Sequence, residues 1–267
     1  MGDDSTVANA TVNGTARGML PIRTSGASMR PLKASESVAR DIVDDIVVSA
    51  MVEGDGLPAE SAMLQQYGVS RETLREALRL LEVQGLISIR RGPGGGPVVG
   101  ALDPANLGRV STLYYHLAGA TYAELFEAWV LCEPIIAELA AANPDRALVR
   151  AVMTPYIDDH GPEDEPLVQF VVRHTEFHTI VGSLARNKVL QLSLMSIGEI
   201  VTHHVINNAD PRDARNTIEH DHHAIAQAIV GGHRAKARRL MQQHIQSITD
   251  LYQATLREQM DDYIGWR

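Results

Sequence analysis

A change of pattern near residue 100 divides this 267-residue chain into two regions with different folds. The first region starts at about Pro31 and ends in the glycine-dense stretch RRGPGGGPVVG, which predicts two short strands around a turn. Beyond the connection ALDPANLG, long segments place apolar residues near a 3.6-residue period, with Asn-Pro, Gly-Pro, Asp-Pro and Gly-Gly pairs between them. The pattern predicts a small α+β domain followed by an all-helical one.

Composition sets the expected limits of each part. Residues 1–30, rich in Gly, Ser, Thr, Ala and Asn, are expected to form a disordered tail. We expect a compact N-terminal domain over 31–101, a linker and connecting helix over 102–119, and an all-helical domain over 120–260. Apolar residues make up 45% of the chain, which is enough for a sizeable core. The expected fold class is mainly α.

Nothing in the sequence points to a membrane or to secretion. No apolar run reaches the ~18 residues that a spanning helix needs, and the N-terminus lacks the basic-then-apolar pattern of a secretory signal. Cys132 is the single cysteine, which excludes an intrachain disulfide and suits a reducing compartment, so we expect a cytoplasmic protein. The net charge of −9 argues against a protein that coats nucleic acid, but it allows a local basic patch.

The stretch that follows Glu60 has the pattern of a helix-turn-helix. Residues 60–67 predict a short helix, Gly68 allows a sharp turn, and Ser70 is a good N-cap for a second helix that runs to about Gln84. Apolar residues of the second helix share one face: Leu74, Ala77, Leu78 and Leu81. Arginines repeat every fourth residue along another face: Arg71, Arg75 and Arg79. A recognition helix needs this division, with one side packed and the other facing phosphates and base edges.

The glycine hairpin adds basic residues next to this helix. Arg90 and Arg91 precede the turn, where a hairpin tip could enter a minor groove. Between Ser70 and Gly92 there are five arginines against three glutamates, a net charge of +2. Taken alone, the helix could equally carry ordinary i,i+4 pairs of arginine with glutamate on a solvated face. The turn and the hairpin together favour DNA binding.

This region resembles the winged helix-turn-helix of the GntR family of bacterial transcription regulators. The matching pieces are LPAE at 57–60, GVSRETLREAL at 68–78 and LEVQGLI at 81–87. The resemblance implies contacts with double-stranded DNA from the start of the recognition helix and from the wing: Ser70, Arg71, Glu72, Arg75, Arg91 and Gly92. Many relatives have arginine where Ser61 stands, so one contact that the resemblance implies is missing and we expect an operator sequence different from theirs.

Nine of the eleven histidines lie between residues 174 and 244. His174 and His178 share a helix face with Phe170, Phe177 and Val181, so that face points inward. Two further histidines fall in line with apolar residues of later helices: His222 and His244. The remaining histidines of this region lie off these faces or near helix ends, and we expect them to be exposed: His203, His204, His220, His223 and His233.

Two interpretations account for the inward histidines. An imidazole buried without partners costs on the order of 1–3 kcal/mol, and a shared divalent cation would satisfy several rings from three helices at once. Alternatively, each ring is a core histidine bonded to a carbonyl or a carboxylate. The residue pattern alone leaves both open.

The region 120–255 resembles the FCD ligand-binding domain of FadR-type GntR regulators, a bundle of six or seven helices. The matching pieces are HTEFH at 174–178, HHAIAQAI at 222–229 and AKARRLMQQH at 235–244. The resemblance implies that His178, His222 and His244 ligate a divalent ion, with His174 as a ligand in place of the family's usual aspartate. This softer ligand set favours zinc, nickel or copper over magnesium or manganese, and zinc is our expectation, with nickel as the alternative.

A second departure from the family concerns the effector. In the stretch EAWVLCE, Trp129 stands where the family's first long effector-domain helix commonly has an arginine that clasps a carboxylate, and Glu133 is the later glutamate. We expect both residues in an effector pocket. An apolar molecule that stacks on the indole then becomes an alternative to a small carboxylic acid, as does a tryptophan that merely fills the core.

These patterns predict a transcription regulator and not an enzyme. We expect a homodimeric repressor on a palindromic operator, controlled by a small-molecule effector that binds in the metal-containing helical domain. One alternative is a regulator for which the metal ion itself is the effector. The other is a metal-dependent hydrolase. The sequence argues against a hydrolase, because no inward carboxylate that could act as a general base stands beside the histidines in sequence.

Overall fold

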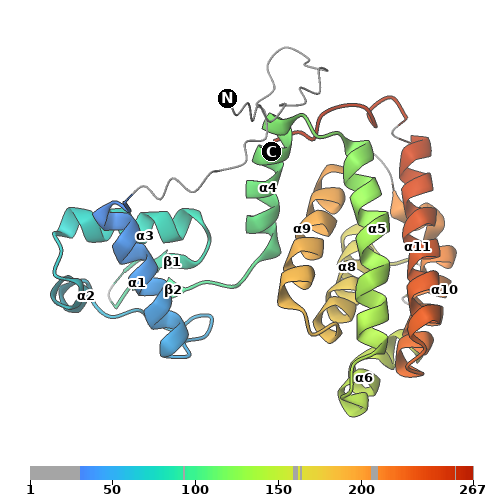
Figure 1. Ribbon diagram of the computed structural model, residues 1–267, viewed down its shortest axis with the longest axis horizontal. Coiled ribbons are helices and arrows are strands. Elements are labelled where there is room, and N and C mark those ends of the chain that lie inside the picture. The colour runs from blue at the N-terminus through green and yellow to red at the C-terminus, as the bar shows by residue number, and fades with distance from the viewer. Residues whose placement is uncertain are drawn as a thin grey trace, which may run out of the picture.

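The computed structural model of the chain describes residues 31–92, 94–158, 162, 164–205, 210–255 and 257–266. It has an N-terminal lobe with the two strands and a larger helical lobe, with one helix between them (Figure 1). The mainly α fold class, an α+β domain before an all-α bundle, is confirmed. The predicted tail, residues 1–30, lies outside the described residues. None of the described helices combines the length and the apolarity that crossing a bilayer requires.

The N-terminal lobe is built from three helices and a hairpin: α1 (Ala34–Val48), α2 (Glu60–Tyr67), α3 (Arg71–Val83), β1 (Ile87–Arg90) and β2 (Gly96–Val99). The strands pair antiparallel, with Ile87 opposite Val99. Gly68 ends α2 with a φ of +62°, and the Ser70 hydroxyl caps α3 by accepting a hydrogen bond from the Thr73 amide at 3.2 Å. The core of the lobe lies between these helices and contains Val38, Ile42, Met63, Leu74, Ala77 and Leu81.

The connecting helix α4 (Pro104–Ala118) leads from the wing to the helical lobe. Asp103 caps its start, where Pro104 costs no hydrogen bond, and Gly119 ends it with a φ of +75°. The helix packs along α9, where the backbones approach closely. A Cβ atom at Gly108 would lie 3.3 Å from the Ser196 carbonyl oxygen. α4 therefore belongs to the helical lobe as much as it links the two.

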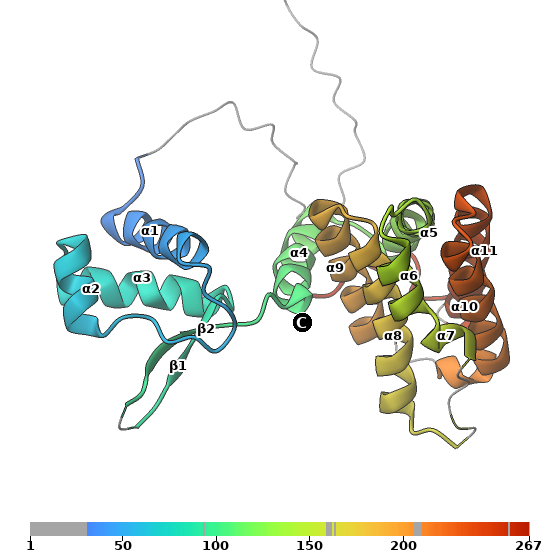
Figure 2. The same cartoon turned by 90° about the horizontal axis from the view of Figure 1, so that it is seen from below.

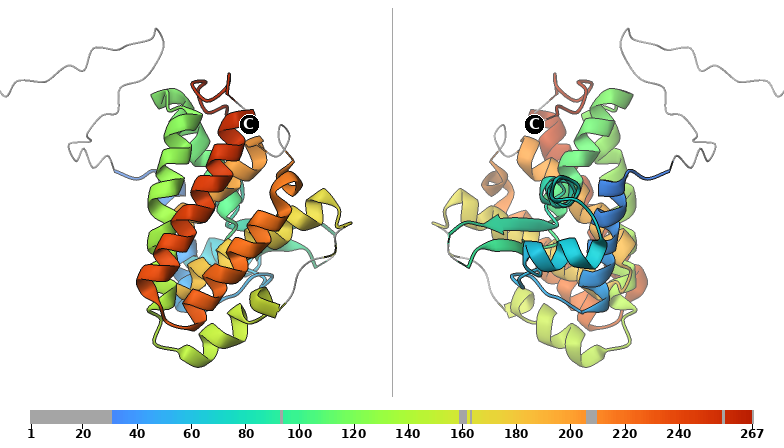
Figure 3. Two further views of the ribbon diagram at one scale, coloured as in Figure 1. Left: turned by 90° about the vertical axis from the view of Figure 1, so that its right-hand side faces the viewer. Right: turned by 90° about the vertical axis from the view of Figure 1, so that its left-hand side faces the viewer.

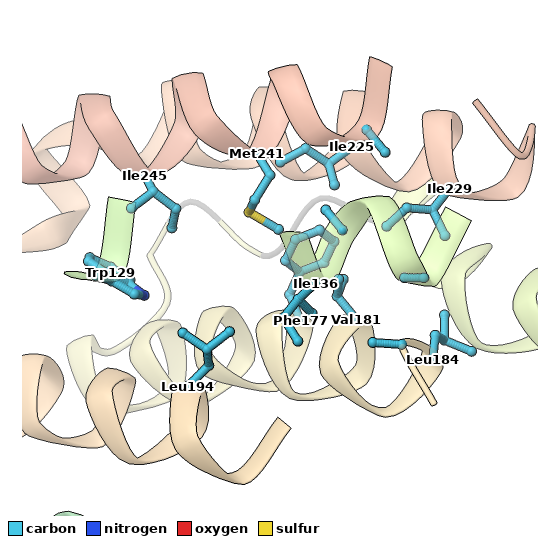
Figure 4. Close-up of a cluster of buried hydrophobic side chains, with 14 of the residues drawn as sticks. Trp129, Ile136, Phe177, Val181, Leu184, Leu194, Ile225, Ile229, Met241 and Ile245 are labelled. Atoms are coloured by element: carbon cyan, nitrogen blue, oxygen red, sulfur yellow. The ribbon is translucent and has the colours of Figure 1, made fainter. Parts of the chain in front are cut away.

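The helical lobe surrounds one core. Its helices are α5 (Tyr122–Ala141), α6 (Arg146–Met153), α7 (Pro155–Asp158), α8 (Leu167–Leu184), α9 (Lys188–Val205), the 3₁₀ turn η1 (Pro211–Ala214), α10 (Arg215–Val230) and α11 (Arg234–Thr255). α5 and α11 lie side by side (Figure 3). Figure 4 shows apolar side chains from α5, α8, α9, α10 and α11 that meet between the helices, with Phe177 and Met241 near the middle.

The packing of this lobe continues beyond residue 260, where we expected the domain to end. Ile264 is 1% exposed, and its amide donates a hydrogen bond to the Ala120 carbonyl at 2.9 Å. The Ile264 carbonyl lies 2.9 Å from His116 Nδ1 at the end of α4. The segment after α11 thus holds the end of α4 against the start of α5.

Candidate functional site

Helix α3 separates its two faces as a recognition helix requires. Its apolar face is buried, and Arg71 and Arg75 have side chains that are 75% and 69% exposed. Arg79 is also exposed, as is Glu72 in the first turn of the helix. Guanidinium groups on this outer face are accessible to a duplex.

An acidic side chain from α2 lies between two of these arginines. Glu60 Oε1 is 3.9 Å from Arg71 Nε and 3.7 Å from Arg75 Nη2. Ion pairs this exposed contribute about 0–1 kcal/mol to stability. They orient the guanidinium groups but leave them available to a ligand. The Ser70 hydroxyl caps the helix, so its expected DNA contact would be additional to that structural role.

The wing, which is the hairpin of β1 and β2, projects from the lobe on the α3 side, away from α1 (Figure 2). Arg90, Arg91 and Gly92 are all exposed. Gly92 has a φ of +100°, a conformation that side chains with a Cβ rarely adopt, so the tip depends on glycine there. The structure thus places the predicted wing residues on the same lobe as the arginines of α3, in an accessible turn.

Three of the four predicted metal ligands come together inside the helical lobe. His178 of α8, His222 of α10 and His244 of α11 each offer a ligand atom within 4.8 Å of the others. The Nε2 atoms of His222 and His244 are 3.0 Å apart. We call these three residues the histidine cluster. His222 and His244 are buried, and the His222 ring stacks on Phe177 with a centroid distance of 3.8 Å.

Each ring of the histidine cluster has a polar neighbour on its other side. Asp221 Oδ2 lies 3.3 Å from His244 Nδ1, and Glu133 Oε1 lies 3.6 Å from His178 Nδ1. His174 lies outside the cluster, with its Nδ1 3.4 Å from Nδ1 of His222. Its position is that of a neighbour that orients the His222 ring, as partners of metal-bound histidines do.

Burial keeps three of the four rings, those of His174, His222 and His244, in the neutral form that ligates metals. Burial lowers the pKa of His174 to about 3, with nearby Arg173 as the second cause. Burial also lowers the pKa of His222 and of His244, although the hydrogen bond to Asp221 opposes this shift at His244.

The cluster also fits one ion in its dimensions. Tetrahedral nitrogen ligands at about 2.1 Å from zinc stand about 3.4 Å apart, so small side-chain shifts would suffice. His178 Nδ1 and His174 Nε2 are buried without a hydrogen bond to any described residue.

A cavity opens beside the histidine cluster. It has an empty volume of about 900 Å³, its opening to solvent included, and is lined by residues of α5, α8, α9, α10 and α11. Trp129 and Glu133, the two predicted pocket residues, both line it, and Trp129 Nε1 donates a hydrogen bond to Glu133 Oε1 at 3.3 Å. His174, His178 and His222 lie in the same wall.

Two features of the site were missed by the sequence analysis. The inward carboxylate sought beside the histidines is Glu133, which comes from α5 and is far from them in sequence. Its i,i+4 spacing from Trp129 was the available signal. His204, expected to be exposed, is 5% exposed, and its Nδ1 lies 2.7 Å from the Tyr122 hydroxyl. That expectation was wrong because the end of α9 packs against the start of α5.

Comparison with known proteins agrees with both lobes. Residues 34–95 match the bacterial regulatory proteins of the gntR family, and residues 124–247 match the FCD domain. The chain is 25% identical over 238 residues to the HTH-type transcriptional repressor NanR of Cronobacter sakazakii, covering 84% of this chain and 88% of that protein. It is 25% identical over 224 residues to the Exu regulon transcriptional regulator of Escherichia coli K12, covering 81% and 83%. Streptococcus agalactiae GntR shares the fold, with a TM-score of 0.61 and 22% identity over 81% of this chain and 99% of that one.

The buried histidines predict how stability depends on pH in protein stripped of metal. Because the pKa of His174 is about 3 in the fold and about 6.5 in the unfolded chain, the unfolded state takes up its proton first as pH falls. The free energy of unfolding should therefore fall between pH 6.5 and pH 3, by about 1.4 kcal/mol per pH unit for each such ring. His174→Gln should flatten this slope in urea titrations at pH 7, 6 and 5. The exposed His220→Gln should not, and equal slopes for His174→Gln and the parent protein would contradict the assignment.

Proposed function

The chain is a DNA-binding transcription regulator of the GntR family with an FCD effector domain, and we propose that it is a repressor which a small-molecule effector releases from DNA. The observation that carries the proposal is the pairing of an arginine-bearing helix in one lobe with a cavity beside the histidine cluster in the other. One of its relatives is named as a repressor. Proteins with these two domains are regulators and not enzymes.

DNA contacts would come from one face of the N-terminal lobe. The start of α3 would enter a major groove, where arginine can bind guanine with two hydrogen bonds, and the wing would reach the neighbouring minor groove. The residues proposed for these contacts are Ser70, Arg71, Glu72, Arg75, Arg91 and Gly92. Glu60, which lies between Arg71 and Arg75, would offset the repulsion between their guanidinium groups until they meet phosphates or bases.

We propose that the regulator works as a homodimer on a palindromic operator. One lobe of this size reads only a few base pairs, and two lobes related by a two-fold axis read two half-sites. α4 offers a surface for this axis, since exposed apolar residues follow one another at alternating steps of three and four along it: Leu107, Val110, Tyr114 and Leu117. That spacing is the heptad repeat by which two helices pack together.

Helix α9 would carry the signal from the effector to DNA. One side of it lines the cavity with Leu194 and Met195, and another side meets α4 at Gly108. In turn, Arg109 of α4 donates a hydrogen bond to the Val83 carbonyl at the end of α3, at 3.4 Å. An effector acts only through its different affinity for two arrangements of the lobes, so it would favour the one in which α9 and α4 misplace the recognition helices.

The histidine cluster would hold one divalent ion, with zinc as the proposed metal and nickel as the alternative. His178, His222 and His244 would ligate it, while His174 would orient His222 and Asp221 would orient His244. A bound ion supplies an electrophilic anchor for an oxygen or nitrogen of the effector. Its role would be structural, as part of the cavity wall, and not catalytic.

Replacing arginines of α3 should weaken operator binding. Arg71→Ala and Arg75→Ala should each lose about 1–3 kcal/mol, which is roughly fivefold to 150-fold in affinity, if the lost contact is bidentate to guanine. A gel-shift series on the operator selected by the parent protein measures this, with Arg150→Ala on the exposed face of α6 as the matched control. Unchanged affinity in both α3 variants would remove this helix from the recognition role.

Protein purified without chelators should contain about one divalent ion per chain by elemental analysis. Acidification should release the ion as the imidazoles become protonated. His222→Ala should abolish the metal content, whereas His220→Ala, an exposed histidine on the same helix, should leave it intact. Metal-free parent protein would favour core histidines instead. Operator binding that changes on addition of zinc alone would identify the ion itself as the effector.

Charged residues placed among the exposed apolar residues of α4 should separate the proposed dimer into monomers. We expect the combined Val110→Glu and Tyr114→Glu variant to sediment as a monomer at micromolar concentration, while the parent protein sediments as a dimer, because the two copies of α4 would bring like charges together. Val172→Glu, a comparably exposed valine on α8, is the control. A dimer that survives the double substitution would move the interface away from α4.

A further inference from the structure

The wall of the cavity beside the histidine cluster carries carboxylates but no permanently charged cation among the described residues. Among the described residues that line it there is no lysine and no arginine, but there are two glutamates, Glu133 of α5 and Glu199 of α9. A divalent ion on three neutral imidazoles would bring two positive charges, and these two carboxylates would offset them. An anionic effector would therefore find no excess positive charge in this cavity.

The two glutamates differ in what they contact. Glu133 is 5% exposed, and its Oε1 accepts a hydrogen bond from Trp129 and lies beside His178. Glu199 is half-buried, and no described residue donates a hydrogen bond to it or lies at ion-pair distance from it. Burial raises the pKa of Glu199, and Asp103 raises it further, whereas His203 lowers it. A positive charge brought next to Glu199 would therefore stabilise its ionised form.

Two arginines lie close to the cavity wall, but their positive charges are already paired with carboxylates. Arg173 and Arg215 lie over the Phe170 ring, with their guanidinium carbons 5.8 and 4.5 Å from its centroid. Both are engaged with the same two carboxylates, Glu165 and Glu219, at N···O distances between 2.7 and 3.4 Å. This group of two arginines and two glutamates is neutral overall.

The rest of the cavity wall suits an apolar body with few polar groups. Apolar and aromatic side chains make up much of it: Trp129, Ile136, Phe170, Val171, Leu194, Met195, Ile218 and Ile248. Tyr252 is only 7% exposed, yet its hydroxyl makes no hydrogen bond with another described residue. Because Tyr252 lines the cavity, its hydroxyl is available to a polar group of a ligand.

We propose that the effector is an organic cation, an amine on an apolar body, whose ammonium group pairs with Glu199. The apolar body lies against Trp129 and Leu194, and Tyr252 hydrogen-bonds a polar group of the same molecule. The proposal rests on the proposed function in one respect, that this cavity is the effector site. Glu199 also borders the groove between α9 and α4, so an ion pair there forms next to the helix that leads to the DNA-binding lobe.

The experiment compares charge on fixed skeletons. Metal-loaded full-length protein is titrated in a calorimeter with amines, alcohols and carboxylates built on the n-hexyl, 2-phenylethyl and 2-(indol-3-yl)ethyl skeletons. At least one amine should bind about tenfold or more tightly than its alcohol, and the carboxylate should bind more weakly than either. Glu199→Gln should reduce the amine to the affinity of the alcohol. Glu127→Gln, the same change at an exposed position of α5, should leave the amine unaffected.

Several results would overturn the proposal: no amine binds, the carboxylate binds best, amine and alcohol bind equally, or Glu199→Gln leaves amine binding unchanged. Operator binding and the thermal midpoint of each variant are measured alongside, to show that Glu199→Gln is folded. The proposed function is tested separately. An amine that binds through Glu199 but does not release the operator supports the site and contradicts the repressor model of release. Protein that binds the operator but binds no amine contradicts the proposed amine site and leaves the proposed DNA-binding function intact.

Discussion

Burial of imidazole rings where α8, α10 and α11 meet is the constraint on which the helical lobe depends. A ring such as that of His222, stacked on Phe177 in the centre of the core, contributes apolar surface but also carries two nitrogens that must find partners. The fold meets this demand by placing His174 of α8 and His244 of α11 next to it. Contacts among these rings thereby fix the register of the helices around one polar centre, in addition to the apolar contacts and ion pairs between them.

That polar centre also decides where the lobe can be hollow. Side chains around the histidine cluster cannot close over it as a purely apolar core would, because doing so would leave more polar atoms without partners. The resulting cavity is closed on one side by α9, a helix that touches α4 with its other side. Under the proposed function, a change in how this cavity is filled would act on the contact between α9 and α4.

The N-terminal lobe was predictable because its signals are local. A glycine at a left-handed turn, a serine at a helix start and arginines at every fourth position define helix, turn and helix without reference to the rest of the chain. The helix boundaries of the larger lobe follow for the same reason. In the histidine cluster, periodicity identified the inward rings but could not distinguish His174 from His178. They share a face, but lie about 6 Å apart along the helix axis, so the neighbouring helices decide which one reaches the cluster.

Contacts between helices distant in sequence were not predictable. The approach of Glu133 to His178, the burial of His204 against Tyr122 and the position of Glu199 on a cavity wall all depend on how helices cross. No periodicity encodes that crossing. The tryptophan at 129, where the family commonly has an arginine, did give information about the effector cavity. It removes a positive charge, and no other described lysine or arginine lines the cavity.

The segment that follows α11 has a consequence for how the two lobes can move. The Ile264 amide donates a hydrogen bond to the Ala120 carbonyl, and the Ile264 carbonyl lies 2.9 Å from His116 Nδ1. The segment therefore bridges the two sides of the bend between α4 and α5. The bend cannot open without detaching this strap. Swinging of the N-terminal lobe must therefore be accommodated elsewhere, in the few residues between β2 and α4, and the bend at Gly119 behaves as a rigid corner instead of a hinge.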